Sequence, residues 1–83
     1  LFRVLKAQGK NAPGGAYGYV INGNMIGGFA LVVRPVDYGN SGIMTFLVNQ
    51  QGIVYQKDLG PDTERIAGGM TAYDPDSSWT RAD

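Results

Sequence analysis

The side chains of this chain that could do chemistry are mostly carboxylates, and they fall in two predicted loops. Asp58, Asp62 and Glu64 follow a predicted strand, and Asp74 and Asp76 lie near the C-terminal end. Several oxygen ligands at loop spacing could hold a hard cation such as calcium, but neither loop has the spacing of an EF-hand. Because Asp commonly serves turns and helix starts, we favour solvated turn and cap residues and predict no metal site.

Acid–base catalysis needs titratable groups whose surroundings push their pKa values apart. The sequence offers Asp58 with Lys57, or Asp58 with Asp62. The spacing between the two aspartates crosses Gly60 and Pro61, so it has no helical periodicity. We therefore predict no catalytic residue and no enzyme. The alternative is an envelope enzyme or small-ligand-binding domain with a site near Asp58 and Asp62.

The residue types that the chain lacks exclude several functional classes. Without cysteine or histidine there is no disulfide framework, no common zinc site and no nucleophile system built on these residues. We predict no cofactor. Seven basic residues balance seven acidic ones, so no long-range field favours nucleic acid or an anionic membrane surface. The longest apolar run has five residues, far below the ~20 that span a bilayer, which predicts no membrane insertion.

The length of 83 residues predicts a single small β domain over residues 1–83. A domain of this size has little margin of stability from its hydrophobic core alone. The chain begins at Leu1 without an initiator methionine, which predicts a fragment of a longer, processed protein.

A β-hairpin in the stretch GIMTFLVNQQGIVYQKDLG is the strongest structural signal of the sequence. Residues 43–48 and 53–57 are rich in β-branched and aromatic residues, which predicts two strands. The loop from Gln50 to Gly52 places glycine where a three-residue hairpin loop needs a positive φ. Gly52 is therefore predicted to be a structural turn residue.

Asn22 and Gly23 give a second hairpin signal, because a type I′ turn needs positive φ at both central positions. The flanking strands are predicted at residues 17–21 and 24–26. Further strands are predicted at residues 2–7, where a short amphipathic pattern occurs, and at residues 29–33.

A helix is predicted to begin at Thr63, after Pro61, and to end at Met70. Two interior glycines limit it to about two turns, because each costs about 1 kcal/mol relative to alanine. Trp79 is expected to anchor an extended tail on the sheet. The predicted fold class is thus mainly β with a minor α component: a small antiparallel sheet of four to five strands and one short helix.

Both faces of the hairpin at residues 43–57 carry large apolar side chains. The predicted register sets Val48 opposite Val54 and Phe46 opposite Gln56 on one face, and Leu47 opposite Tyr55 and Thr45 opposite Lys57 on the other. A sheet with one solvated face shows a cleaner apolar–polar alternation. One face is therefore expected to cover the core and the other to bind a partner.

We place the interaction surface at Leu47, Ile53 and Tyr55. The partners that we expect are, in order, an upstream segment of the same protein, a second copy, and another envelope protein. A second copy would pair through a sheet edge or through the apolar face.

The motifs APGGA, GGFAL, MTFLVNQQG, YQKDLGPDT and DPDSSW occur in an order that resembles the C-terminal portion of a bacterial domain-of-unknown-function family, number 2950. The resemblance covers residues 8–79. It implies an exported protein of a Gram-negative bacterium, and hence an extracytoplasmic location in the periplasm or at the cell surface. It brings no catalytic residue with it.

A looser similarity runs through GGFALVVRPVDYGNSGIMTFLVNQQGIVY, which is similar to the β-meander of type IV pilins and pseudopilins. In those proteins the sheet packs on a long, hydrophobic N-terminal helix, which this sequence does not contain. We expect a non-enzymatic extracytoplasmic structural or interaction module, and a pilin-like assembly subunit is one form of that role.

Overall fold

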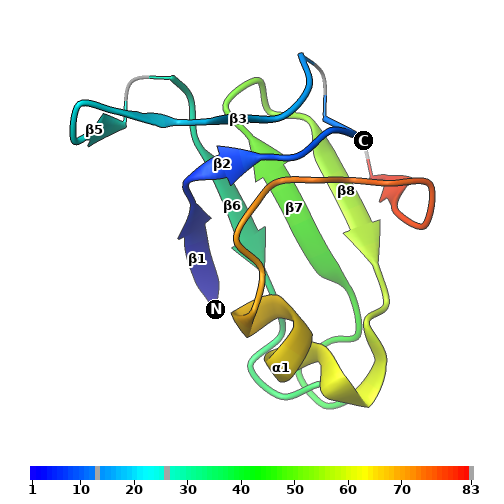
Figure 1. Ribbon diagram of the computed structural model, residues 1–83. Helices are drawn as coiled ribbons and strands as arrows, with labels where there is room; N and C mark the ends of the chain where they lie inside the picture. Colours follow the sequence, from blue (N-terminus) through cyan, green and yellow to red (C-terminus); the bar gives the residue numbers. More distant parts are fainter. Residues whose placement is uncertain (13, 26, 83) are drawn as a thin grey trace.

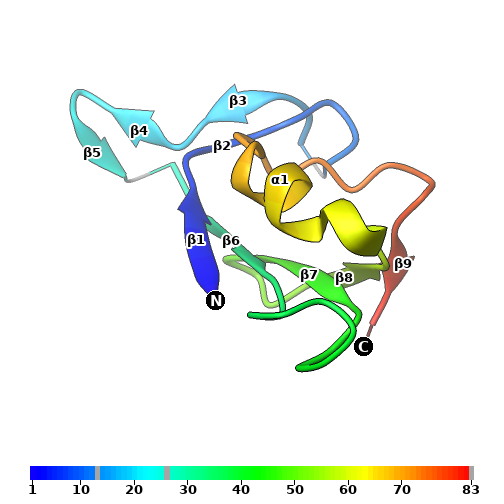
Figure 2. The same cartoon turned by 90° about the horizontal axis from the view of Figure 1, so that it is seen from below.

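The computed structural model describes residues 1–12, 14–25 and 27–82 (Figure 1). These residues form a mainly β fold, in which a five-stranded antiparallel sheet has the strand order β1-β6-β7-β8-β9. One short helix lies against one face of this sheet (Figure 2). The predicted fold class is confirmed. Ile26, the end of one predicted strand, lies outside the described residues.

The strands of the main sheet pair antiparallel with their neighbours throughout. They are β1 (Phe2–Leu5), β6 (Ala30–Val33), β7 (Thr45–Asn49), β8 (Val54–Lys57) and β9 (Thr80–Arg81). Two short ribbons stand beside this sheet. They consist of β2 (Ala7–Gln8) with β3 (Tyr17–Gly18), and β4 (Val20–Ile21) with β5 (Asn24–Met25).

Both hairpin turns lie where the sequence predicts them. Gly52 has a φ of 76°, and Asn22 and Gly23 have φ values of 51° and 82°, as a type I′ turn requires. Asn49 supports the loop after β7, because its side-chain oxygen accepts hydrogen bonds from the amides of Gln51 (3.0 Å) and Ile53 (3.1 Å). The β7–β8 register is the predicted one at every pair.

The predicted strand at residues 17–21 is divided in the structure, and Tyr19 is the reason. Its side chain is fully buried, and its amide donates to the carbonyl of Lys6 at 2.7 Å, which bends the chain between β3 and β4. The predicted strand at residues 2–7 is likewise divided into β1 and β2. Tertiary contact of one aromatic ring has therefore overridden the local strand pattern.

The helical segment begins with a 3₁₀ turn, η1 (Gly60–Asp62), and continues as α1 (Thr63–Gly68). The helix ends within two turns, as the glycines predict. The guanidinium of Arg3 donates to the carbonyl of Ala67 at 2.7 Å and to that of Met70, and so ties the C-terminal end of α1 to β1.

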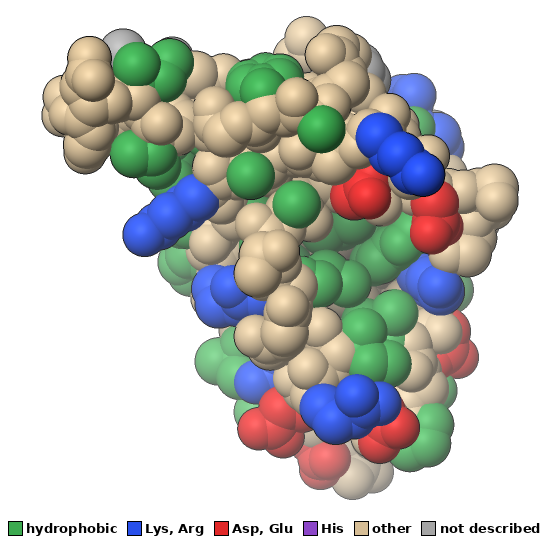
Figure 3. Space-filling view, in the orientation of Figure 1, with side chains coloured by type: hydrophobic (Ala, Val, Ile, Leu, Met, Phe, Trp, Pro, Cys, Tyr) green, Lys and Arg blue, Asp and Glu red, His purple; other side chains and the backbone are tan. Residues whose placement is uncertain are grey.

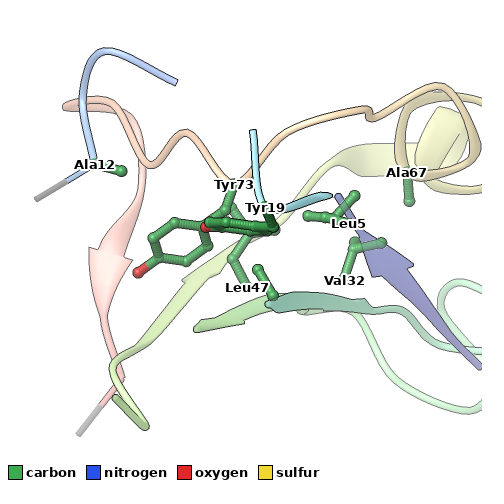
Figure 4. Close-up of a cluster of buried hydrophobic side chains, with 8 residues drawn as sticks. Leu5, Ala12, Tyr19, Val32, Leu47, Ala67 and Tyr73 are labelled. Carbon is green, nitrogen blue, oxygen red and sulfur yellow. The ribbon is translucent and has the colours of Figure 1, made fainter. Parts of the chain in front are cut away.

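The core lies between the main sheet and a layer formed by α1 and the segments that carry Tyr19 and Tyr73, and aromatic rings fill much of it (Figure 4). Tyr19 and Tyr73 meet there above Leu47 and Leu5. Trp79 is half-buried and packs against this cluster, as expected of an anchor. The tail that the sequence predicts as merely extended joins the sheet as β9, where the amide of Ala82 donates to the carbonyl of Val54 at 2.9 Å.

Candidate functional site

Asp58 is an exposed turn residue whose carboxylate is occupied locally. One of its oxygens accepts from the Tyr38 hydroxyl at 2.6 Å and from the Gly60 amide at 2.9 Å. The Tyr38 hydrogen bond, helped by the amide, holds the pKa of the Asp58 carboxyl below its usual value. Asp58 therefore joins the loop after β6 to the start of η1.

Asp62 contacts a different partner, since its carboxylate pairs with Arg65 at 3.2 Å on the surface. The second acidic loop is similar: Asp76 accepts from the amide of Ser78 at 2.8 Å and from its hydroxyl, and these bonds hold the pKa of Asp76 below its usual value. Among the described residues no three His, Cys, Asp or Glu side chains come together as a metal site would require. Asp58 and Asp76 therefore serve turns, whereas the Asp74 carboxylate accepts from the distant Asn11 amide at 2.9 Å.

The strand register sorts the side chains of the sheet into two faces, because directly opposite residues point the same way. On the face away from α1, two rows cross the sheet, and we call this surface the open face. Its rows are Phe2–Val33–Phe46–Gln56–Thr80 and Val4–Leu31–Val48–Val54. Neither row contains a charged residue, and every member except Gln56 and Thr80 is apolar.

The other face carries Arg3, Val32, Leu47 and Tyr55 in one row and packs beneath α1 and Tyr73. The predicted interaction surface is therefore corrected. Leu47 is only 1% exposed, and Tyr55 is half-buried with its ring against Tyr73, 6.5 Å between centroids. The two-face prediction chose the wrong face. Both faces of β7 carry apolar side chains, Leu47 on one and Phe46 and Val48 on the other, and the packing of α1 and Tyr73 decides which face is covered.

Ile53 is half-buried. It lies just before β8, outside the paired residues, so it belongs to neither row of the open face. Phe2 is 71% exposed, and the central members of the open face are half-buried by one another. Of the described residues, none forms a helix or strand over the open face, whereas α1 covers the opposite one (Figure 2).

A hollow of about 370 Å³ lies at one end of the open face. Val33 and Phe46 line it from the sheet, and Ile43, Met44 and Pro35 line it from the loop between β6 and β7. Hydrogen bonds within this loop keep its shape, including those from the amides of residues 40 and 41 to the Asp37 carbonyl, at 3.0 and 2.9 Å. The open face is thus an apolar surface with a hollow at one end.

The second exposed apolar feature is the ribbon of β4 and β5, residues 20–25, which we call the hairpin arm. It projects from the body of the molecule (Figures 1 and 3) and contributes to a longest dimension of 40 Å. Val20 is 43% exposed, Ile21 46% and Met25 37%. The chain carries no charge from residue 11 to residue 33, so the arm itself is uncharged.

Strand β1 forms one edge of the sheet, and one hydrogen bond shows which of its backbone groups point away from β6. The Arg34 amide donates to the Leu1 carbonyl at 2.8 Å, so by alternation Phe2 and Val4 direct their backbone groups away from β6. Arg3 and Lys6 flank this edge, and basic residues on an edge oppose pairing with an identical edge.

A family model described as "Protein of unknown function (DUF2950)" matches residues 1–82. Neither the curated proteins nor the solved structures contain a significant match. Within the described part of the chain, no helix is both long enough and apolar enough to cross a bilayer.

Proposed function

Because the chain belongs to the DUF2950 family, whose description assigns no activity, we propose a function from its surfaces: it is a non-enzymatic interaction module that binds a second copy of itself through the open face. The observation that carries the proposal is the pair of uncharged rows across that face. Exposed apolar patches of this kind are characteristic of interaction sites.

A second copy fits this surface because the open face carries no charge that would repel an uncharged surface of another copy. The main sheet edge is a poorer contact, since pairing two β1 strands sets the basic side chains of Arg3 and Lys6 near their counterparts. We therefore expect self-association through the open face rather than through the β1 edge.

The size of the face indicates a weak interaction. With strands about 4.8 Å apart and residues about 3.4 Å apart, the rows and their margins cover roughly 400 Å². With a matching area on the other copy, the interface buries roughly 800 Å², below the ~1,200 Å² of ordinary specific interfaces. We expect self-association that becomes visible only at high protein concentration or when copies are held close together.

The test is sedimentation velocity from about 10 μM to about 1 mM, the range in which an interface of this size associates. Val48→Lys places a charge in the middle of the open face and should abolish association. Val36→Lys is the matched control, because Val36 is 66% exposed and belongs to neither row. A wild-type chain that stays monomeric over the whole range, or a Val48→Lys variant that associates like wild type, would contradict the proposal.

An extracytoplasmic location is part of the proposal and is supported by the family resemblance to exported proteins. The fold needs no disulfide, since the chain has no cysteine. Fractionation of a Gram-negative host that expresses the full-length protein tests the location. The similarity to pilins stays a prediction: among the described residues α1, with six residues, is the longest helix.

A further inference from the structure

We propose that the hairpin arm of one copy docks on the open face of the next, so that copies associate head to tail. This inference rests on the proposed function and names the surface that the open face recognises. It follows from the shape of the arm, from its lack of charge and from its direction relative to the open face.

The arm exposes apolar side chains on both of its sides. Val20 pairs with Met25 on one side and Ile21 pairs with Asn24 on the other, and all four are exposed. A two-stranded ribbon is marginally stable in water when nothing covers it. The arm therefore gains most from an apolar surface of another molecule.

The base of the arm is held firmly, which fixes the direction in which it projects. The hydroxyl of buried Tyr19 donates to the side-chain oxygen of Gln8 at 3.0 Å, and the Gly27 amide donates to the Tyr19 carbonyl at 2.9 Å. A side chain at Gly27 would approach that carbonyl to 3.2 Å, so glycine permits this close crossing of the two segments. A base held in this way limits the directions that the arm can take, which lowers the entropic cost of docking.

The open face offers a surface of matching chemistry. Its hollow of about 370 Å³ is lined largely by apolar side chains and exceeds the ~150 Å³ cavity that holds a benzene ring. An aliphatic side chain of the arm, such as Ile21, is small enough to enter. Neither the arm nor the rows of the open face carry a charge. Arg34, which also lines the hollow, donates from its guanidinium to the Pro35 carbonyl at 3.2 Å, so docking there does not leave it without a partner.

The direction of the two surfaces makes the association open-ended. The arm lies on the α1 side of the sheet, whereas the open face points the other way (Figure 2). A copy that offers its arm to one neighbour therefore leaves its own open face for another. Heterologous contacts of this kind produce chains of copies unless the rotation closes a ring.

The first experiment is complementation between two monomeric variants. Ile21→Lys disables the arm and leaves the open face intact, and Val48→Lys does the reverse. Each variant alone should self-associate with an affinity about tenfold or more below that of wild type, because the substitution places a charge in an apolar contact. An equimolar mixture should form a heterodimer and nothing larger, because one functional arm and one functional face remain.

The outcomes separate this inference from the proposed function. If Ile21→Lys associates like wild type while Val48→Lys does not, the open face is a binding surface but the arm is not its partner, and the inference is wrong. If the mixture stays monomeric, the inference is also wrong. If Val48→Lys associates like wild type, both proposals are wrong. Met25→Lys is a second arm variant in case Ile21→Lys fails to fold, and Val36→Lys is the control.

The second experiment uses the absence of cysteine from the natural chain. A copy with Ile21→Cys, mixed with a copy carrying Phe46→Cys at the hollow, should form a heterodimeric disulfide under mild oxidation. The control replaces the first copy with Val36→Cys. Equal yields with arm and control would overturn the proposed contact.

Discussion

Replacing Leu47 by alanine tests which face of the sheet is the core. Leu47 is 1% exposed, and the change removes three buried carbons, worth about 0.8 kcal/mol each in transfer free energy. A cavity contribution raises the expected loss of unfolding free energy to about 3 kcal/mol. A chain of this length has a total stability of only about 4–12 kcal/mol, so the loss is a large fraction of it.

Val48→Ala is the matched control, because Val48 is the next residue of β7 and points to the open face. It should cost less than about 1 kcal/mol, since its side chain is only half-buried. Urea unfolding, followed by the fluorescence of the single tryptophan, Trp79, and by circular dichroism, measures both values in dilute solution. Equal losses for the two variants, or a loss below about 1 kcal/mol for Leu47→Ala, would refute the assignment of the faces.

Three further predictions concern the loops. Asn49→Ala should cost about 1–3 kcal/mol in urea unfolding because two turn amides lose their acceptor, and Asn49→Asp, which keeps an acceptor oxygen, should cost less. Gly9→Ala should destabilise the fold because a Cβ there collides with the Asp74 carboxylate; a double-mutant cycle with Asp74→Ala should show strong non-additivity, and additive losses would contradict the contact. The folded-state pKa values of Asp58 and Asp76 lie below their usual values, so their contribution to stability is present above about pH 4 and is lost as the pH falls through the lowered values. Asp58→Asn and Asp76→Asn should flatten this part of the pH–stability curve, and an unchanged curve would speak against the two hydrogen-bonded turns.

Local chemistry made much of the fold predictable. Asn22, Gly23 and Gly52 identify their turns because positive φ values are costly for most other residues. The hairpin turn at Gly52 also sets the β7–β8 register, because a slip of one residue would move every side chain of a strand to the opposite face of the sheet. Strand β9 was not predicted as a strand, because it is two residues long and owes its pairing to β8.

The interaction surface was less predictable, and Leu47 illustrates why. The sequence shows that both faces of the hairpin are apolar, and from this it predicts a surface beyond the core. It does not say which face α1 and the tyrosines will cover. The sequence predicts the turn of the hairpin arm but not its projection, because the strand pattern of residues 17–21 conceals the bend at Tyr19.

The sequence by itself determined the fold class, the two hairpin turns, the register of β7 with β8 and the lack of the residue types on which most active sites depend. These properties are local or compositional, so no distant contact is needed to specify them. Only the tertiary structure decided that Leu47 belongs to the core, that Phe46 and Val48 lie on the open face, and that residues 20–25 project as an arm. Those outcomes depend on where α1, Tyr19 and Tyr73 pack against the sheet. Such contacts join segments that are distant in sequence, so no single segment specifies them.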